Sequence, residues 1–216
     1  MSSGLNSEPA PTCALCPRLA EFRAANEAAF PDFFNAPVPS FGKASARLLI
    51  VGLAPGLKGA NRTGRPFTGD YAGDLLYETL LDTGFAKGTY DKRPDDSLTL
   101  AGCRIANAVR CVPPQNKPTP QEAANCRPFL AATFAEMKNL SAVLALGRIA
   151  HEAVLRTLDV PLKSAPFAHA AKHRLGNIAL FDSYHCSRYN TQTRRLTPEM
   201  FADVLMSIRE HIDSAS

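Results

Sequence analysis

Four cysteines, at two widely separated places in the chain, could together hold a metal centre. Cys13 and Cys16 form a C-x2-C pair near the N-terminus, whereas Cys111 and Cys126 form a wider pair with 14 residues between them. Four thiolates suit either a 4Fe–4S cluster or a structural zinc ion. The open second pair favours a cluster, because structural zinc sites usually combine two compact pairs, but the spacing alone leaves both metals open.

A glycine-rich segment, GLAPGLKGANRTGRPFTGD (52–70), is the second candidate region. Its five glycines let the backbone approach a ligand closely, but it contains neither a G-x-x-x-x-G-K-[ST] phosphate loop nor a G-x-G-x-x-G fingerprint. Asp70 is its only carboxylate, and this side chain could orient a water molecule or cap a helix that begins near residue 73. Phe67 could stack on a ligand or belong to the core.

His185 and Asn107 are further candidates. His185 lies in YHCSRYNTQTRRLT (184–197), directly after an expected strand, with Ser187 and Asn190 close behind. The segment has no G-x-S-x-G nucleophile elbow, which argues against a serine hydrolase, although a lone histidine is often only a packed or surface imidazole. Asn107 falls within an expected strand, where asparagine is disfavoured, so a functional role explains it better than a structural one.

Short apolar runs that alternate with helical stretches predict the frame that positions these residues. The expected parallel strands are 46–52, 104–110, 142–147 and 177–183. The expected helices are 17–30, 73–84, one that starts at a Thr119–Glu122 capping box, 148–158 and 198–212. The pattern predicts a disordered tail at 1–12 and one α/β domain over 13–216, with three α/β/α layers and a roughly four-stranded parallel sheet. Loops 53–70, 111–119 and 184–195 would then meet at the carboxyl edge of the sheet, where ligands bind.

Charge and composition narrow the class of protein. The net charge is +4, and the stretch from Lys163 to Arg195 holds six Lys/Arg against a single carboxylate. Such a stretch attracts phosphates, although a solvated basic surface explains it equally well. No apolar run is long enough to span a bilayer and no secretory signal is visible, so we expect a cytoplasmic protein without membrane partners. In a cytoplasmic protein, the six cysteines are not expected to form disulfides.

Taken together, these segments resemble the uracil-DNA glycosylase superfamily and, within it, the iron–sulfur type 5 branch. The run 52–70 resembles the first motif of the family, and HCSRYN (185–190) resembles the second. The segment NAVRCVPPQNKP (107–118) is similar to the part of the family that joins a base-reading asparagine to the third cluster cysteine. The resemblance covers about residues 13–210. It implies a monomeric, monofunctional enzyme that flips uracil, and other deaminated bases such as hypoxanthine, out of double-stranded DNA and hydrolyses the N-glycosidic bond.

The resemblance also implies a role for each candidate residue. His185 would stabilise the carbonyl oxygen that gains charge as the base leaves, Asp70 would orient the attacking water, Phe67 would stack on the base and Asn107 would read its edge. The 4Fe–4S ligands would be Cys13, Cys16, Cys111 and Cys126. The other residues around the base would be Gly52, Ala54, Ser187 and Asn190. The DNA contacts would be Lys58, Arg62, Arg65, Arg188, Tyr189 and Arg195.

One departure from related families concerns the group that activates water. Sister families carry a carboxylate or an asparagine just after the first glycine of the first motif, whereas this chain has Leu53 and Ala54 there. This absence matches type 5 and argues against a uracil-only enzyme of type 4, but it leaves the identity of the water-activating group open. A third alternative is a non-catalytic iron–sulfur module that binds damaged DNA, against which His185 and Asn107 argue.

Overall fold

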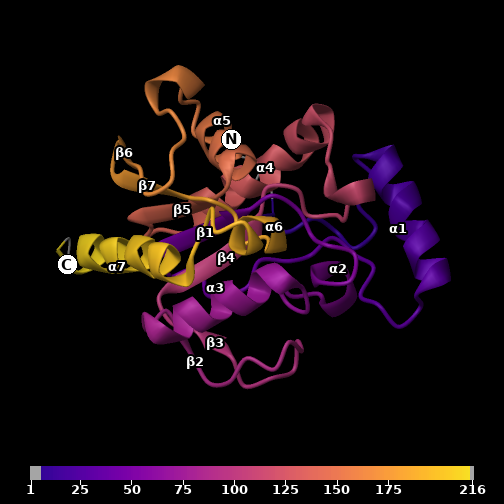
Figure 1. Cartoon of the computed structure of the whole chain (residues 1–216). Coiled ribbons are helices and arrows are strands. Elements are labelled where there is room, and N and C mark those ends of the chain that lie inside the picture. The colour runs from indigo at the N-terminus through magenta and orange to yellow at the C-terminus, as the bar shows by residue number, and fades with distance from the viewer. Residues whose placement is uncertain (1–5, 215–216) are drawn as a thin grey trace.

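A five-stranded sheet in the order β4-β1-β5-β7-β6 forms the centre of the computed structural model, which describes residues 6–214 (Figure 1). The strands are β1 (Leu48–Gly52), β4 (Cys103–Asn107), β5 (Ala142–Leu146), β6 (Lys172–Leu175) and β7 (Ile178–Ser183). The first four strands of this order are parallel to one another, and β6 is antiparallel to β7. The predicted four-stranded parallel sheet is therefore confirmed, with one added edge strand.

Helices cover both faces of the sheet and make the predicted three layers (Figure 1). The helices are α1 (Pro17–Ala29), α2 (Ala60–Thr63), α3 (Tyr71–Asp82), α4 (Pro120–Glu136), α5 (Arg148–Thr157), α6 (Arg188–Gln192) and α7 (Pro198–Ser214). Alternate residues of β1 point to opposite faces: Leu48 and Ile50 pack with α3 and α7, whereas Leu49 and Val51 pack with α4 and α5. Burial on both faces explains why β1 is apolar throughout. Within residues 6–214, no helix is both long and apolar enough to cross a bilayer.

Local capping sets where the helices that flank the loops begin. Thr119 and Glu122 form the predicted capping box, in which the Thr119 hydroxyl accepts from the Glu122 amide and the Glu122 carboxylate accepts from the Thr119 amide. Asp70 caps α3 by accepting from the Gly73 amide at 3.1 Å. These side chains satisfy amides that have no partner inside the helix.

Several features of the chain differ from the sequence-based expectation, among them the short helices α2 and α6, which lie in segments expected to be loops. The strand expected at 104–110 ends at Asn107, and β6, together with the small hairpin of β2 (Ala86–Lys87) and β3 (Thr99–Leu100), was not predicted. The disordered tail expected at 1–12 does not hold for residues 6–12, because Ser7 is buried and donates to Glu136 while Glu8 pairs with Arg110. Residues 1–5 lie outside the described residues.

Candidate active site and cysteine site

A cavity of about 360 Å³ lies where the loops after β1, β4 and β7 meet, at the carboxyl ends of parallel strands. Four of the predicted catalytic and base-binding residues share its wall, namely Phe67, Asp70, Asn107 and His185. Ala54 and Ser187 line it as well. The tertiary structure therefore brings together residues that are more than 100 positions apart in the sequence, and the size of the cavity suits a small organic ligand.

Asn107 is the last residue of β4, and its side-chain amide faces Gly52 on the neighbouring strand β1. It pairs in register with Gly52, and a side chain added at Gly52 would collide with Asn107 Oδ1 and with the Phe67 ring. Asn107 is only 3% exposed, and its Oδ1 has no hydrogen-bond partner in the structure. A buried amide oxygen without a partner is costly, so this atom is available to a donor that enters the cavity.

Phe67 contributes to both the cavity and the core. Its ring belongs to the cluster beneath the sheet and lies 6.0 Å from the ring of His185, between centroids. Its backbone adopts the left-handed conformation, with φ 55°, which is strained for an aromatic residue. The two roles considered for Phe67 are thus compatible, because its ring belongs to the buried cluster and the residue also lines the cavity.

His185 is held in place through its backbone and leaves its ring free. The Asn190 side chain donates to the His185 carbonyl at 2.9 Å, and a side chain at Gly147 would contact the His185 Cβ at 3.4 Å. Within residues 6–214 the ring nitrogens make no hydrogen bond to protein. Burial lowers the pKa of His185, because desolvation penalises the imidazolium, so the ring is neutral at pH 7 and offers one N–H and one lone pair.

Asp70 combines the two roles considered for it. Its Oδ1 accepts from the Gly73 amide as the cap of α3, while its Oδ2 packs beneath Gly59, where any side chain would collide with it. Burial raises the pKa of Asp70 and outweighs the hydrogen bond from Gly73. The cap is therefore confirmed, and the same residue also lines the cavity.

One cavity residue, Asn116, was missed by the sequence analysis. It lies in the proline-rich loop after β4, lines the cavity and adopts a left-handed backbone with φ 57°. The run PPQNKP was visible in the sequence as a stretch of unusual composition, but nothing in it showed which side chain would face the cavity. Leu53 and Ala54 also line the cavity, and their side chains are apolar.

Comparison with known proteins identifies this arrangement. The family model of the Uracil DNA glycosylase superfamily matches residues 39–209. The chain belongs to this superfamily. It is similar to the type-5 uracil-DNA glycosylase of Thermus thermophilus, with 44% identity over 91% of this chain and 92% of the relative. The type-5 uracil-DNA glycosylase of Pyrobaculum aerophilum is 38% identical over 89% of this chain and 86% of the relative, whereas a type-4 enzyme from Thermotoga maritima matches only 50% of this chain, at 39% identity. The chain is therefore a DNA glycosylase of the type-5 branch, an enzyme that hydrolyses N-glycosyl bonds.

Most of the predicted DNA contacts of this glycosylase lie exposed on the loops that border the cavity. Ser187 caps α6 at the cavity wall, and the next two residues, Arg188 and Tyr189, are exposed, with Tyr189 70% exposed. The Arg195 guanidinium lies 4.5 Å from the ring centroid of Tyr184 and is also exposed. Lys58 and Arg62 are exposed on the first loop. Their contact with DNA stays a prediction.

Arg65 is the exception, and its prediction as a phosphate contact is wrong. The residue is 6% exposed, and its guanidinium makes a bidentate pair with Asp96 at 2.7 and 2.8 Å. Its Nε donates to Thr68 at 2.7 Å, and the ring of Phe41 lies 5.2 Å away. With its donors engaged inside the protein, Arg65 stabilises the first loop and cannot reach a phosphate.

The four cysteines predicted as metal ligands line one small cavity of the glycosylase. Cys13 and Cys16 precede α1, Cys111 follows β4, and Cys126 lies within α4; all four thiols are free. Three of the four sulfur atoms accept from nitrogen donors: the Arg110 amide reaches Cys126 at 3.3 Å, the Arg23 guanidinium reaches Cys111 at 3.5 Å and the Asn125 amide reaches Cys16 at 3.7 Å. Such N–H···S bonds surround iron–sulfur clusters and tune them.

The separation of the sulfur atoms bears on which metal fits. Among the described residues, no three of these sulfurs lie within 4.8 Å of one another. A tetrahedral zinc ion with Zn–S bonds of about 2.3 Å would place its four sulfurs about 3.8 Å apart. The arrangement suits a larger group with one cysteine at each corner, as a 4Fe–4S cluster has.

Proposed function

We propose that this glycosylase removes deaminated bases, hypoxanthine as well as uracil, from double-stranded DNA, and that it acts as a monomer. The observation that carries the proposal is the unpartnered Oδ1 of Asn107, buried in a cavity that also holds Phe67 and His185. A base inside a duplex cannot reach such a cavity, so the nucleotide must be flipped out, which costs a few kcal/mol and is cheapest at a mismatch such as G·U.

The amide of Asn107 supports the choice of substrate class. Its oxygen accepts and its nitrogen donates, so it complements an edge with an N–H next to a carbonyl. Deamination produces that edge in both uracil and hypoxanthine, whereas cytosine and adenine present an unprotonated ring nitrogen beside an amino group. The cavity of about 360 Å³, with small residues such as Ala54 and Gly56 in its wall, has room for one-ring and two-ring bases.

His185 supports the departure of the base. As the N-glycosidic bond breaks, negative charge develops on a carbonyl oxygen of the base while the sugar becomes oxocarbenium-like. The neutral imidazole can donate its N–H to that oxygen in a site with little water. A donor of this kind is typically worth roughly 3–4 kcal/mol, or about 10²–10³ in rate.

Asp70 is the group we assign to the water. Leu53 and Ala54 offer no polar side chain, whereas Asp70 lines the cavity and also caps α3 through its Oδ1. An ionised carboxylate there can hold water by accepting a hydrogen bond and can stabilise positive charge on the sugar. Protonation of Asp70, which its burial favours, would remove both effects.

Cys13, Cys16, Cys111 and Cys126 would hold the 4Fe–4S cluster. The cluster would supply four bonds that tie the start of α1 to the loop after β4 and to α4. Hydrolysis of a glycosidic bond transfers no electron, so we assign the cysteines a structural role. Anaerobically prepared protein should contain close to four iron and four sulfide per chain, and stoichiometric zinc without iron would overturn this assignment.

One incubation tests the proposed activity. Labelled duplexes that carry G·U, A·U or T·hypoxanthine are treated with the protein and then with alkali, which breaks the strand at abasic sites. We expect cleavage at uracil and at hypoxanthine, and none with His185→Ala at the same time points, which controls for contaminating glycosylases. Cleavage at uracil alone would reduce the proposal to a uracil-only enzyme, and DNA binding without cleavage would mean a non-catalytic module.

A further inference from the structure

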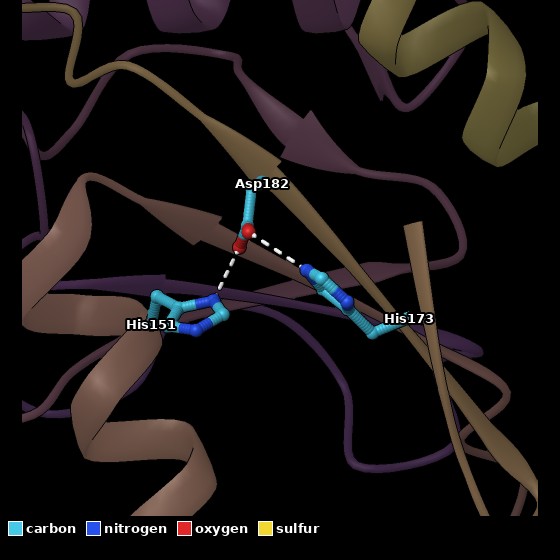
Figure 2. Close-up of side chains that lie close together, drawn as sticks. All are labelled: His151, His173 and Asp182. Carbon is cyan, nitrogen blue, oxygen red and sulfur yellow. Dashed lines mark hydrogen bonds and ion pairs between the residues drawn. The ribbon is translucent and has the colours of Figure 1, made fainter. Parts of the chain in front are cut away.

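His151, Asp182 and His173 form a compact cluster outside the active site (Figure 2). His151 lies in the first turn of α5, Asp182 in β7 and His173 in β6. His151 Nδ1 is 2.7 Å from Asp182 Oδ1, and His173 Nε2 is 3.3 Å from Asp182 Oδ2. Asp182 and His151 are buried, with side chains 0% and 2% exposed, whereas His173 is partly exposed. The predicted function of the protein uses none of the three.

The contact that His151 Nε2 makes with a backbone carbonyl determines which ring nitrogen carries the hydrogen. It therefore also determines which nitrogen of a neutral ring faces Asp182 with a lone pair. His151 Nε2 is 2.8 Å from the Ala165 carbonyl, which can only accept, so Nε2 carries a hydrogen. In a neutral ring Nδ1 then has no hydrogen, and its lone pair points directly at Asp182 Oδ1. Two lone pairs at 2.7 Å repel each other, so a cation must lie between them, either a proton or a metal ion.

We propose that this cluster is a second metal site, for a divalent ion of the zinc class bound by His151 Nδ1, His173 Nε2 and Asp182. Two imidazoles with one carboxylate are a common ligand set for zinc. The contact of His151 Nε2 with a backbone carbonyl is the outer-shell bond that metal-binding histidines usually make. All three ligand atoms lie within 4.8 Å of one another.

The observed distances come close to those that zinc needs. With bonds of about 2.0–2.1 Å in a tetrahedral site, ligand atoms stand about 3.3 Å apart. The His173–Asp182 separation of 3.3 Å matches, and the His151–Asp182 separation of 2.7 Å requires an outward movement of less than about 1 Å. The ring of Phe167 packs against that of His151 at 5.6 Å between centroids. His173 is the partly exposed member of the cluster, so an ion would enter past it.

A metal here would brace the segment that carries His185. Asp182 lies three residues before His185, and its backbone exchanges hydrogen bonds with Ala170 and Ala171. Helix α5, which carries His151, begins directly after Gly147, whose amide donates to the Ser183 carbonyl at 2.8 Å. The ion would thus join α5, β6 and β7 at the base of the catalytic loop, as a structural ion remote from the cysteines.

The test uses protein with its iron–sulfur cluster intact, metal-depleted at this site by mild chelation and then dialysed against Co²⁺ or Zn²⁺. We expect one equivalent of cobalt beyond the iron content, visible absorption typical of four-coordinate Co²⁺, and none of the sulfur-to-cobalt absorption that binding at the cysteines would produce. Saturating Zn²⁺, at about 100 times Kd, should raise Tm by about 5–10 °C.

His173→Gln is the discriminating variant, because Gln can still donate to Asp182 but is a poor zinc ligand. We expect His173→Gln to fold, to keep its iron and to lose both the extra cobalt and the rise in Tm. The control variant His211→Ala, which changes a histidine on α7, should keep the extra cobalt and the rise in Tm. Absence of the extra equivalent in the unmodified protein would overturn the proposal and assign a proton to the cluster. Equal cobalt binding in His173→Gln would overturn it as well.

Discussion

His185 and His151 occupy opposite kinds of environment in one small domain. Burial without any partner lowers the pKa of His185, and its ring faces a cavity. Burial would also lower the pKa of His151, but the hydrogen bond and charge of Asp182 outweigh burial and raise it, and both ring nitrogens are engaged. At the cavity, the ring without a partner is available to an organic ligand. The ring of His151, by contrast, joins α5 to β7 through Asp182, directly or through the proposed ion.

The same contrast separates Asn107 from Arg65. Both are buried polar residues, Arg65 within the first loop and Asn107 beside its first residue, Gly52. Asn107 Oδ1 has no partner, whereas the Arg65 guanidinium is paired with Asp96. The strong pairing also holds the pKa of Asp96 down at about 2. In both comparisons, the residue with a free hydrogen-bonding atom lines the cavity, and the fully paired residue holds parts of the fold together.

The largest effect on stability should come from His151→Ala. The substitution leaves the Asp182 carboxylate buried with its closest partner removed, and loss of one member of a buried pair costs about 3–5 kcal/mol. Urea unfolding should show this loss, while the single-turnover rate per folded molecule stays close to normal. If His151→Ala kept full stability but lost its single-turnover activity, His151 would have a role in catalysis instead.

His185→Ala should instead lower the catalytic rate and leave the stability nearly unchanged. We expect the single-turnover rate on G·U duplexes to fall by about 10²–10³ because the donor to the leaving base is gone, with DNA affinity little changed. The urea midpoint should stay within the range of ordinary surface substitutions, because the ring makes no hydrogen bond to the described part of the chain. His211→Ala is the matched control, and a normal rate in His185→Ala would remove this residue from the mechanism.

Two substitutions at Asp70 separate its cap from its catalytic role. Asp70→Asn keeps an oxygen for the Gly73 amide, so stability should hold, but the chemical step should slow because the charge is lost. Asp70→Ala should slow the step further and also cost about 1 kcal/mol of stability through the lost cap. Thermal melts and single-turnover kinetics measure both, and a normal rate in each variant would leave Asp70 as a cap alone.

The pH dependence of the rate gives a sharper test of the same residue. Since burial raises the pKa of Asp70, its carboxylate is lost on acidification at a higher pH than an ordinary aspartate would show, and the rate should fall there. Protonation of Asp70 would not itself unfold the protein, because a group with a raised pKa binds its proton more tightly in the folded state and so favours folding as the pH drops. Rate–pH profiles should lose this acidic limb in Asp70→Asn.

The smallest effect should come from Arg195→Gln. Exposed cations release counterions from DNA, so log K should fall linearly with log salt, and loss of one contact should flatten the slope by about one unit for every sequence. Arg62→Gln should act in the same way if it reaches a phosphate. A salt-independent affinity would mean that this basic surface faces away from the DNA.

The amino-acid sequence alone predicted the features that depend on strong local patterns. Apolar runs marked all four parallel strands, Thr119 and Glu122 marked the start of α4, and the long first motif identified the superfamily. Four cysteines in two spaced pairs pointed to one site, and the structure places them around one cavity. Hydrophobic periodicity, capping and motif spacing act over a few neighbouring residues, so they can be read before folding.

Only the tertiary structure shows which groups that are distant in the sequence come into contact. Arg65 was predicted to contact phosphate, but it pairs with Asp96, 31 positions away, and nothing near either residue announces that contact. In the same way His151 finds Asp182, and Glu8 holds residues 6–12 against Arg110, although this segment has the composition of a loose tail. A charged or polar side chain has the same identity in both roles, and only the partner that the fold brings within about 3 Å determines whether it stabilises the protein or stays free for a ligand.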